Sequence, residues 1–178
     1  TYLAVVGEIS PSLLIYKRSG DVFTKITDPI PSPSGYTAGC AFSADDEYLA
    51  VTGYGPPHLY IYKRIGDTFT KLPDPEDLPT AQAYGCAFGG EYLAVVGEYG
   101  IRLYKKNDDE FTKIPNPGQS PSGGRKCAFS ADGTYLAIVS NYGPYLFIFK
   151  KDGDRFTRLD NPAVMPTGAG LNCAFTPD

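Results

Sequence analysis

Short apolar runs recur along the chain, and each has the length of a β-strand. Residues 2–6 (Tyr-Leu-Ala-Val-Val) form one such run, and comparable runs follow through the whole sequence. In the run at residues 146–149, Leu and Ile point to one side of a strand and two Phe to the other. Because a sheet that is apolar on both faces must be covered on both faces, the pattern predicts sheets that stack face to face.

Four short motifs occur four times each, always in the same order. Tyr-Leu-Ala begins at residues 2, 48, 92 and 135, and Cys-Ala-Phe begins at residues 40, 86, 127 and 173. Phe-Thr-Lys/Arg begins at residues 23, 69, 111 and 156, and Asp/Asn-Pro follows at 28, 74, 116 and 161. Such a period indicates a repeat architecture. We predict a single domain, residues 1–178, of four repeats at roughly 1–35, 36–80, 81–122 and 123–167, with 168–178 completing the first unit.

Each repeat is predicted to contain four antiparallel strands. The Cys-Ala-Phe strand comes first, the Tyr-Leu-Ala strand second, a strand such as residues 59–63 third and the Phe-Thr-Lys strand fourth. Gly-Asp turns at residues 20–21, 66–67 and 153–154 precede the fourth strand, and residues 107–109 (Asn-Asp-Asp) replace this turn in the third repeat. A central Lys or Arg marks the fourth strand as an exposed outer strand, because a charge there blocks edge pairing.

The inner hairpin carries a family resemblance. Residues 129–137 (Phe-Ser-Ala-Asp-Gly-Thr-Tyr-Leu-Ala) resemble the inner hairpin of WD-repeat propellers and of their YVTN-type bacterial relatives. Residues 61–75 are similar to WD-like repeats of bacteriophage structural proteins and related bacterial proteins. The Trp-Asp and Gly-His pairs of eukaryotic WD repeats do not occur. Repeat and resemblance together predict an all-β fold, a β-propeller with four four-stranded blades per chain.

The two ends of the sequence match each other. Joining residue 178 to residue 1 recreates the hairpin motif of the fourth repeat with one residue missing. We therefore expect strand-exchange closure of a ring, which leaves no open sheet edge. Closure within one chain would give a four-bladed ring. Closure between two chains would give an eight-bladed homodimer in which residues 171–178 pair with residues 1–6, and large apolar faces favour this prediction.

Composition excludes some partners. Hydrophobic residues make up 42% and charged residues 20% of the 178 residues, which is typical of a globular chain. A net charge of -4 offers no basic stripe, so we predict no nucleic-acid partner. The apolar runs are much shorter than a membrane span, so no membrane partner is expected either.

Reactive residues are few. The four Cys occupy equivalent positions, where neighbouring sheets are ~10 Å apart, beyond the ~7 Å Cα separation that a disulfide allows. We expect buried free thiols, which favour a reducing compartment, although the phage resemblance would also fit a virion. His58 is the only histidine, and we assign Asp45, Asp132 and Asp154 to turn capping. We therefore predict no metal, no cofactor and no enzymatic activity.

The candidate ligand face lies where two kinds of loop meet. Long loops such as residues 28–39 and 74–85 and the short loops after each second strand emerge at one end of a propeller, and they vary most between repeats. The candidate ligand-binding residues there are Tyr36, Tyr54, Tyr84, Glu98, Tyr99, Arg125, Asn141, Tyr142 and Asn172, with Glu8 beside them. Tyrosine suits a glycan or a peptide ligand, although these rings could instead pack over loop prolines.

From this face we predict a non-enzymatic propeller scaffold or binding module. One alternative is a glycan-binding, receptor-recognition module such as a phage particle carries. The other is an engineered or fragment propeller without a ligand.

Overall fold

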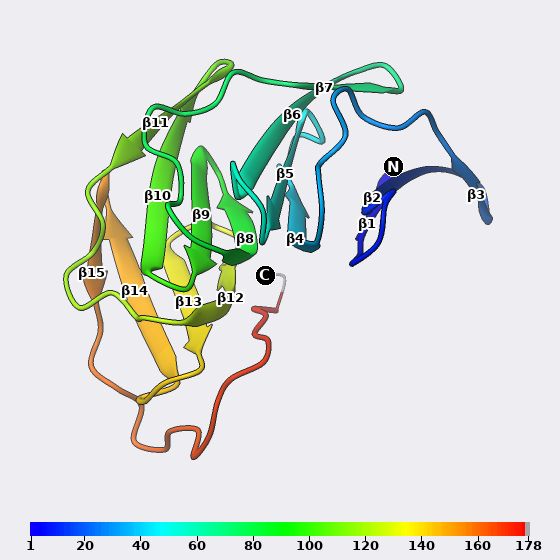
Figure 1. Ribbon diagram of the computed structural model, residues 1–178. Helices are drawn as coiled ribbons and strands as arrows, with labels where there is room; N and C mark the ends of the chain where they lie inside the picture. Colours follow the sequence, from blue (N-terminus) through cyan, green and yellow to red (C-terminus); the bar gives the residue numbers. More distant parts are fainter. Residues whose placement is uncertain (177–178) are drawn as a thin grey trace.

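The computed structural model describes residues 1–176, which form 15 strands in four antiparallel sheets (Figure 1). Strand order within each sheet follows the chain, so every pair of neighbouring strands is a hairpin. Among these residues no helix is long and apolar enough to cross a membrane. The predicted all-β class is confirmed.

Three of the sheets have four strands, and the first has three. The first sheet contains β1 (Tyr2–Val6), β2 (Leu13–Ser19) and β3 (Val22–Lys25). The second contains β4 (Thr37–Phe42), β5 (Tyr48–Gly53), β6 (Leu59–Ile65) and β7 (Thr68–Lys71). The third contains β8 (Ala83–Gly89), β9 (Tyr92–Gly97), β10 (Gly100–Asn107) and β11 (Glu110–Ile114). The fourth contains β12 (Gly124–Phe129), β13 (Tyr135–Ser140), β14 (Leu146–Asp152) and β15 (Arg155–Arg158).

The turns before the outer strands have the backbone that their sequences favour. Gly20, Gly66 and Gly153 have φ between 55° and 61°, and Asp108 takes the equivalent position with φ 51°. This left-handed region suits glycine and is tolerated by aspartate. The predicted positions of these turns and the outer place of β3, β7, β11 and β15 are both confirmed.

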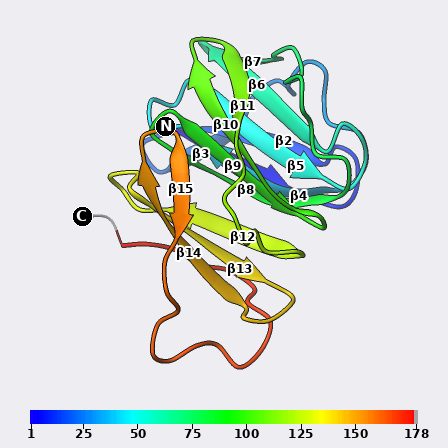
Figure 2. The ribbon, with the colours of Figure 1, turned by 90° about the vertical axis from the view of Figure 1, so that its left-hand side faces the viewer.

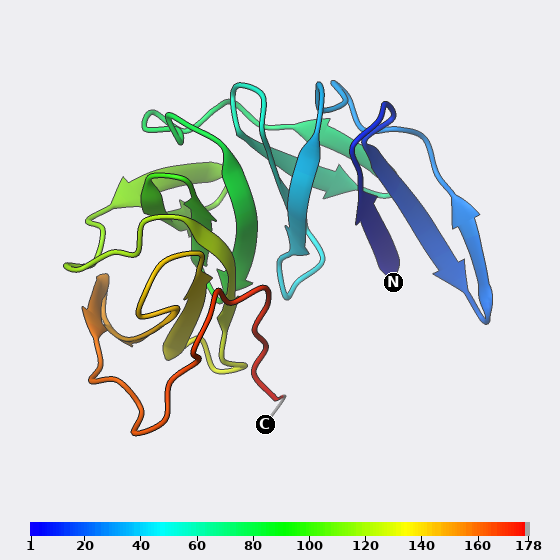
Figure 3. The same ribbon diagram turned by 60° about the horizontal axis from the view of Figure 1, so that its bottom comes forward.

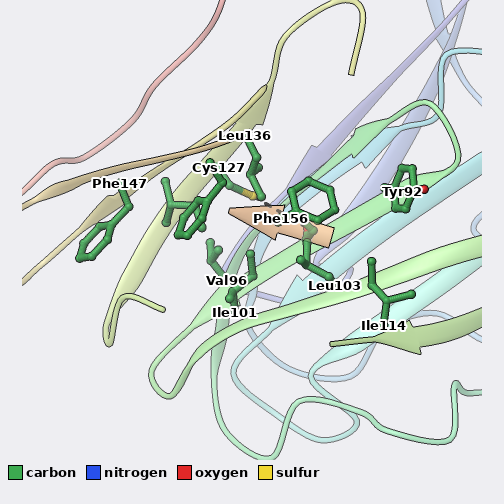
Figure 4. Close-up of a cluster of buried hydrophobic side chains, with 12 residues drawn as sticks. Tyr92, Val96, Ile101, Leu103, Ile114, Cys127, Leu136, Phe147 and Phe156 are labelled. Atoms are coloured by element: carbon green, nitrogen blue, oxygen red, sulfur yellow. Dashed lines mark hydrogen bonds between the residues drawn. The ribbon is translucent and has the colours of Figure 1, made fainter. Parts of the chain in front are cut away.

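Apolar side chains fill each space between adjacent sheets. One cluster joins the first and second sheets, another joins the second and third, and the last joins the third and fourth. Figure 4 shows the last of these, where Val96 and Leu103 of the third sheet meet Cys127 and Phe156 of the fourth. Stacking therefore covers both faces of the two middle sheets, as the apolar pattern predicts.

The four sheets follow one another around an open arc, with the inner strands β4, β8 and β12 on its concave side (Figures 1 and 3). A view turned by a quarter shows the fourth sheet at one end of this arc, with the C-terminal segment beside it (Figure 2). Within residues 1–176, the segment after residue 169 bonds to the fourth sheet and makes no hydrogen bond to β1. The first sheet lacks a fourth strand for this reason.

The expected pairing of residues 171–178 with residues 1–6 is thus not made inside a single chain, and residues 177–178 lie outside the described residues. Strand exchange between chains and the number of blades in a closed ring stay predictions.

Candidate functional site

A row of tyrosines lies where the two kinds of loop meet. The rings of Tyr36 and Tyr54 have centroids 4.2 Å apart, and those of Tyr54 and Tyr84 are 5.5 Å apart, edge to face. The Tyr54 N–H also donates to the Tyr36 carbonyl over 3.0 Å. The long loop before β4 and the short loop after β5 therefore emerge together, as the sequence predicts.

Charged residues surround this row. We call Tyr36, Tyr54 and Tyr84, together with Glu98 and Arg125, the tyrosine face. Proximity to Tyr54 raises the pKa of Tyr36, with partial burial and Glu8 adding to the effect and Arg125 opposing it. Burial raises the pKa of Tyr84, as do Glu98, Tyr54 and Tyr142, while Arg125 again opposes them. Both phenols therefore stay protonated at neutral pH, and the Tyr84 hydroxyl donates its proton to Gln82 Oε1 over 3.2 Å.

A lysine crosses the concave side of the arc beneath this face. Lys126 Nζ donates to the carbonyls of Ala38 and Tyr84, each over 2.7 Å, and so links the inner strands of three sheets. Gly39 and Gly85 leave room for it, because a Cβ on Gly85 would lie 3.1 Å from the Lys126 side chain. Lys126 was not among the site residues predicted from the sequence. The available signal was a single cation at the position before Cys, where two other repeats have Gly.

A bulge at the start of each inner strand positions these residues. The register shifts between Thr37 and Gly39, between Ala83 and Gly85, and between Gly124 and Lys126. A bulge bends the strand and redirects the extra side chain. The extra residue in each case is Ala38, Tyr84 or Arg125, so the bulge determines which residue each repeat contributes to the face.

The other predicted residues lie further out. Tyr142 is 63% exposed but close enough to influence the pKa of Tyr84, and the Asn141 N–H donates to the Gly123 carbonyl over 3.0 Å. Tyr99 is 71% exposed, and Asn172 accepts a hydrogen bond from the Cys173 N–H. In the part of the chain that the structure describes, Tyr99 does not stack on the three tyrosine rings and Asn172 makes no hydrogen bond to these tyrosines.

The turn aspartates divide into two roles. Asp132 accepts bonds from the Ser130 hydroxyl at 2.5 Å and the Thr134 N–H at 2.9 Å, which lower its pKa to about 2. Asp45 closes the equivalent turn in the second sheet, so turn capping is confirmed for both residues. Asp154 instead accepts a bond from Tyr92 of the third sheet at 2.6 Å. Among the described residues no backbone N–H donates to Asp154, and its other donor is Lys105 Nζ, also of the third sheet, so the predicted turn capping was wrong for this residue. The sequence does not reveal a contact between sheets.

The four cysteines are free and sit against the preceding sheet. Burial raises the pKa of every one of these thiols, which makes them poor nucleophiles. Within residues 1–176, no group of three or more His, Cys, Asp or Glu side chains could hold a metal ion.

The tyrosine face is a surface and not an enclosed pocket. The cavity beside Glu98 and Gln82 has a volume of about 20 Å³, room for about one water molecule. A groove of about 980 Å³ lies elsewhere, along β15 at the outer edge of the fourth sheet, with Phe156 and Arg158 in its wall. The convergence of charged and aromatic groups, and not cavity size, identifies the candidate site.

No family model and no curated protein matches the sequence. A functionally unknown protein from Desulfotomaculum acetoxidans is similar in structure, with 17% identity, a TM-score of 0.64 and coverage of 97% of this chain and 53% of that one. A periplasmic gluconolactonase from Pseudomonas aeruginosa has 15% identity and a TM-score of 0.60, with 84% and 50% coverage. A gluconolactonase from Xanthomonas campestris has 19% identity and a TM-score of 0.54, with 76% and 43% coverage.

At these identities the likeness shows the fold alone, which is that of a β-propeller. This chain spans about half the length of the solved structures that it matches. None of the three is a WD-repeat or bacteriophage protein, so that resemblance stays a prediction.

The predicted non-enzymatic scaffold or binding module was wrong. Two of the three similar structures are named gluconolactonases, so this architecture carries enzymatic chemistry in other proteins. The expectation of no enzyme rested on the absence of a histidine cluster or a nucleophile motif in the sequence. Side chains that meet only across several sheets leave no such motif.

Proposed function

We propose that the tyrosine face hydrolyses a lactone of a small polyhydroxylated acid. The observation that carries this proposal is the meeting of Glu98 and Arg125 around Tyr84, at the loop end of a fold shared with two gluconolactonases. A carboxylate, a guanidinium and phenolic donors are the groups that such a reaction uses.

Lactone hydrolysis needs a base, an oxyanion partner and a place for the hydroxyl groups of the substrate. Water attacks the carbonyl carbon and gives a proton to Glu98, which is exposed and has the chemistry of a general base. Arg125 stabilises the negative charge that develops on the carbonyl oxygen. The ring C–O bond then breaks, the proton passes from Glu98 to the leaving oxygen, and an open hydroxy acid is released.

The tyrosines bind and orient the substrate in this scheme. The protonated hydroxyl of Tyr36 donates a hydrogen bond to one of its oxygens, and the exposed ring of Tyr54 offers an apolar surface. The Tyr84 hydroxyl donates to Gln82 Oε1, so its oxygen accepts a hydrogen bond from a hydroxyl of the substrate. Lys126 has a positioning role, because both of its hydrogen bonds go to backbone carbonyls of the inner strands.

The test is hydrolysis of glucono-1,5-lactone, followed as proton release above the spontaneous rate. We expect Glu98→Gln to lower kcat by roughly 10²-fold or more, because it removes the base. Glu110→Gln, on the exposed outer strand β11, is the matched control and should leave the rate unchanged. A wild-type rate equal to the buffer rate, or full activity in Glu98→Gln, would contradict the proposal.

We also propose that the four sheets are blades of a ring closed by strand exchange, with eight blades from two chains. The support is that one chain matches about half of each similar structure, including 53% of the protein from Desulfotomaculum acetoxidans. A four-bladed ring closed within one chain is the alternative. The position of residues 170–176 against the fourth sheet favours two chains.

A further inference from the structure

The same three residue types, tyrosine, lysine and aspartate, join adjacent sheets at each of the three junctions. A tyrosine on the Tyr-Leu-Ala strand of one sheet donates to an aspartate in the outer turn of the next sheet. A lysine on the strand that follows the Tyr-Leu-Ala strand pairs with the same aspartate. We call this set the junction triplet. Its members are Tyr2, Lys17 and Asp67, then Tyr48, Lys63 and Asp109, then Tyr92, Lys105 and Asp154.

The geometry of the junction triplet hardly varies. The Tyr–Asp distances are 2.5, 2.7 and 2.6 Å along the chain, and the Lys–Asp distances are 2.8, 2.7 and 2.8 Å. The same tyrosines meet a phenylalanine of the next sheet edge to face, with centroids 5.7, 5.7 and 5.6 Å apart. The hydrogen bonds also lower the pKa values of Asp67, Asp109 and Asp154.

The fourth sheet presents the donor half of another triplet. Tyr135 and Lys150 lie directly opposite each other on β13 and β14, as Tyr2 and Lys17 do on β1 and β2. Tyr135 is half-buried and Lys150 is exposed. Neither side chain has a hydrogen-bond or ion-pair partner among residues 1–176.

The first sheet presents the acceptor half. Asp21 follows Gly20 in the turn before β3, which is the position of Asp67 before β7. Phe23 is 50% exposed, although its equivalent Phe69 is 1% exposed.

The apolar face of the first sheet is open in the same way. Leu3 and Val5 are 45% and 44% exposed, whereas their equivalents Leu49 and Val51 are fully buried against the preceding sheet. This face has the residues of a sheet junction but no neighbouring sheet.

The C-terminal segment already occupies the inner-strand position of one more sheet. The Gly170 N–H donates to the Ser140 carbonyl over 3.0 Å, as the Thr37 N–H does to the Gly7 carbonyl over 3.1 Å. Cys173 Sγ lies 3.8 Å from the Ala137 carbonyl oxygen, and the other three cysteines make the equivalent contact at 3.6–3.8 Å. What this position lacks is a second strand to pair with.

We propose that the occupant is a second copy of this chain, whose first sheet docks on the fourth sheet. This inference rests on the ring proposed above and specifies its seam. A fourth junction triplet forms from Tyr135 and Lys150 with the partner's Asp21. Each chain carries both halves, so one twofold rotation closes both seams together.

The repeat also specifies the strand register at the seam. Cys40, Ala41 and Phe42 pair with Val51, Ala50 and Leu49 in the second sheet. The equivalent pairs at the seam are Cys173 with the partner's Val5, Ala174 with the partner's Ala4, and Phe175 with the partner's Leu3. Opposite residues of an antiparallel pair have Cα atoms about 4.5–5.5 Å apart, within reach of a disulfide.

The test is disulfide cross-linking in the full chain. Val5→Cys should form a disulfide with the native Cys173 of the partner on mild oxidation and give a covalent dimer on a non-reducing gel. The matched control is Val5→Cys combined with Cys173→Ser, which should give no covalent dimer. Asp21→Asn should raise the dimer Kd about tenfold, because it weakens the Tyr135–Lys150–Asp21 triplet at each of the two seams.

The results of cross-linking and of mass measurement test the seam and the ring separately. A dimer in solution whose cross-link does not depend on Cys173 would contradict the proposed strand register at the seam. It would not contradict the eight-bladed ring. A monomer for the unmodified chain would overturn seam and ring together. Lactone hydrolysis is measured separately, so neither result depends on it.

Discussion

Single aspartates stabilise the hairpins on which the fold is built. Asp45 accepts hydrogen bonds from the Ser43 hydroxyl at 2.5 Å and the Glu47 N–H at 3.0 Å. Burial opposes its ionisation, but these two bonds and the nearby Lys106 outweigh burial and lower the pKa of Asp45 to about 2. Because the pKa of this carboxyl is lower in the folded than in the unfolded protein, the free energy of unfolding decreases as pH falls.

Asp45 is the residue at which this pH dependence can be tested. The unfolded pKa of an aspartate is about 3.9, so the contribution of Asp45 is fully present above about pH 4 and is lost as pH falls towards 2. Asp45→Asn should therefore flatten the decline of the urea midpoint between pH 5 and pH 2. Asp46→Asn, one residue away, is the control. A decline in Asp45→Asn as steep as in the wild type would contradict this role.

Individual site residues were predictable only in part. The tyrosines could be located because the repeats align and Tyr36, Tyr54 and Tyr84 stand where the other repeats differ. Lys126 could not be assigned, because its role depends on backbone carbonyls of two other sheets. Such a contact occurs once among the described residues and is not repeated in the other sheets, so the repeat pattern of the sequence does not reveal it.

The inner strands pack closely because two of them have glycine at the point of contact. A Cβ on Gly85 would lie 2.9 Å from the Arg125 carbonyl oxygen and 3.2 Å from the Lys126 Cα. Both are backbone atoms, so a Cβ on Gly85 would fit only if the backbone of β12 shifted. The close approach of β8 and β12 therefore requires glycine at this position.

Gly85→Ala should accordingly destabilise the fold by about 1–3 kcal/mol through this overpacking. Urea unfolding followed by circular dichroism measures the effect. Gly118→Ala is the matched control, because a Cβ there meets nothing within 4 Å. Equal stability of the two variants would show that the inner strands are not packed as described.

Strand identity and order were predictable at the scale of elements. The outer turns and the charged outer strands follow directly from glycine, aspartate and lysine at fixed positions. The bulges at the start of β4, β8 and β12 were not predicted, because the extra residue is Ala38, Tyr84 or Arg125 and so leaves no common signature in the sequence.

At the scale of the molecule, three complete junctions and two complementary half-junctions define an arc. Its open faces carry Leu3, Val5 and Phe23 at one end and Tyr135 with Lys150 at the other. Exposed apolar faces and an unpaired strand edge promote association. The sequence predicted that the ends match, but a repeat cannot tell whether they meet within one chain or between two.

The mass in solution is the most direct test of the proposed two-chain ring. Light scattering on the purified chain should give about 38 kDa, twice the 19.2 kDa of one chain, at micromolar concentration. That result would follow from two arcs whose half-junctions close each other. A mass of about 19 kDa that persists when the protein is concentrated would contradict the two-chain ring. The open faces of the first and fourth sheets would then not be covered by a second copy of the chain.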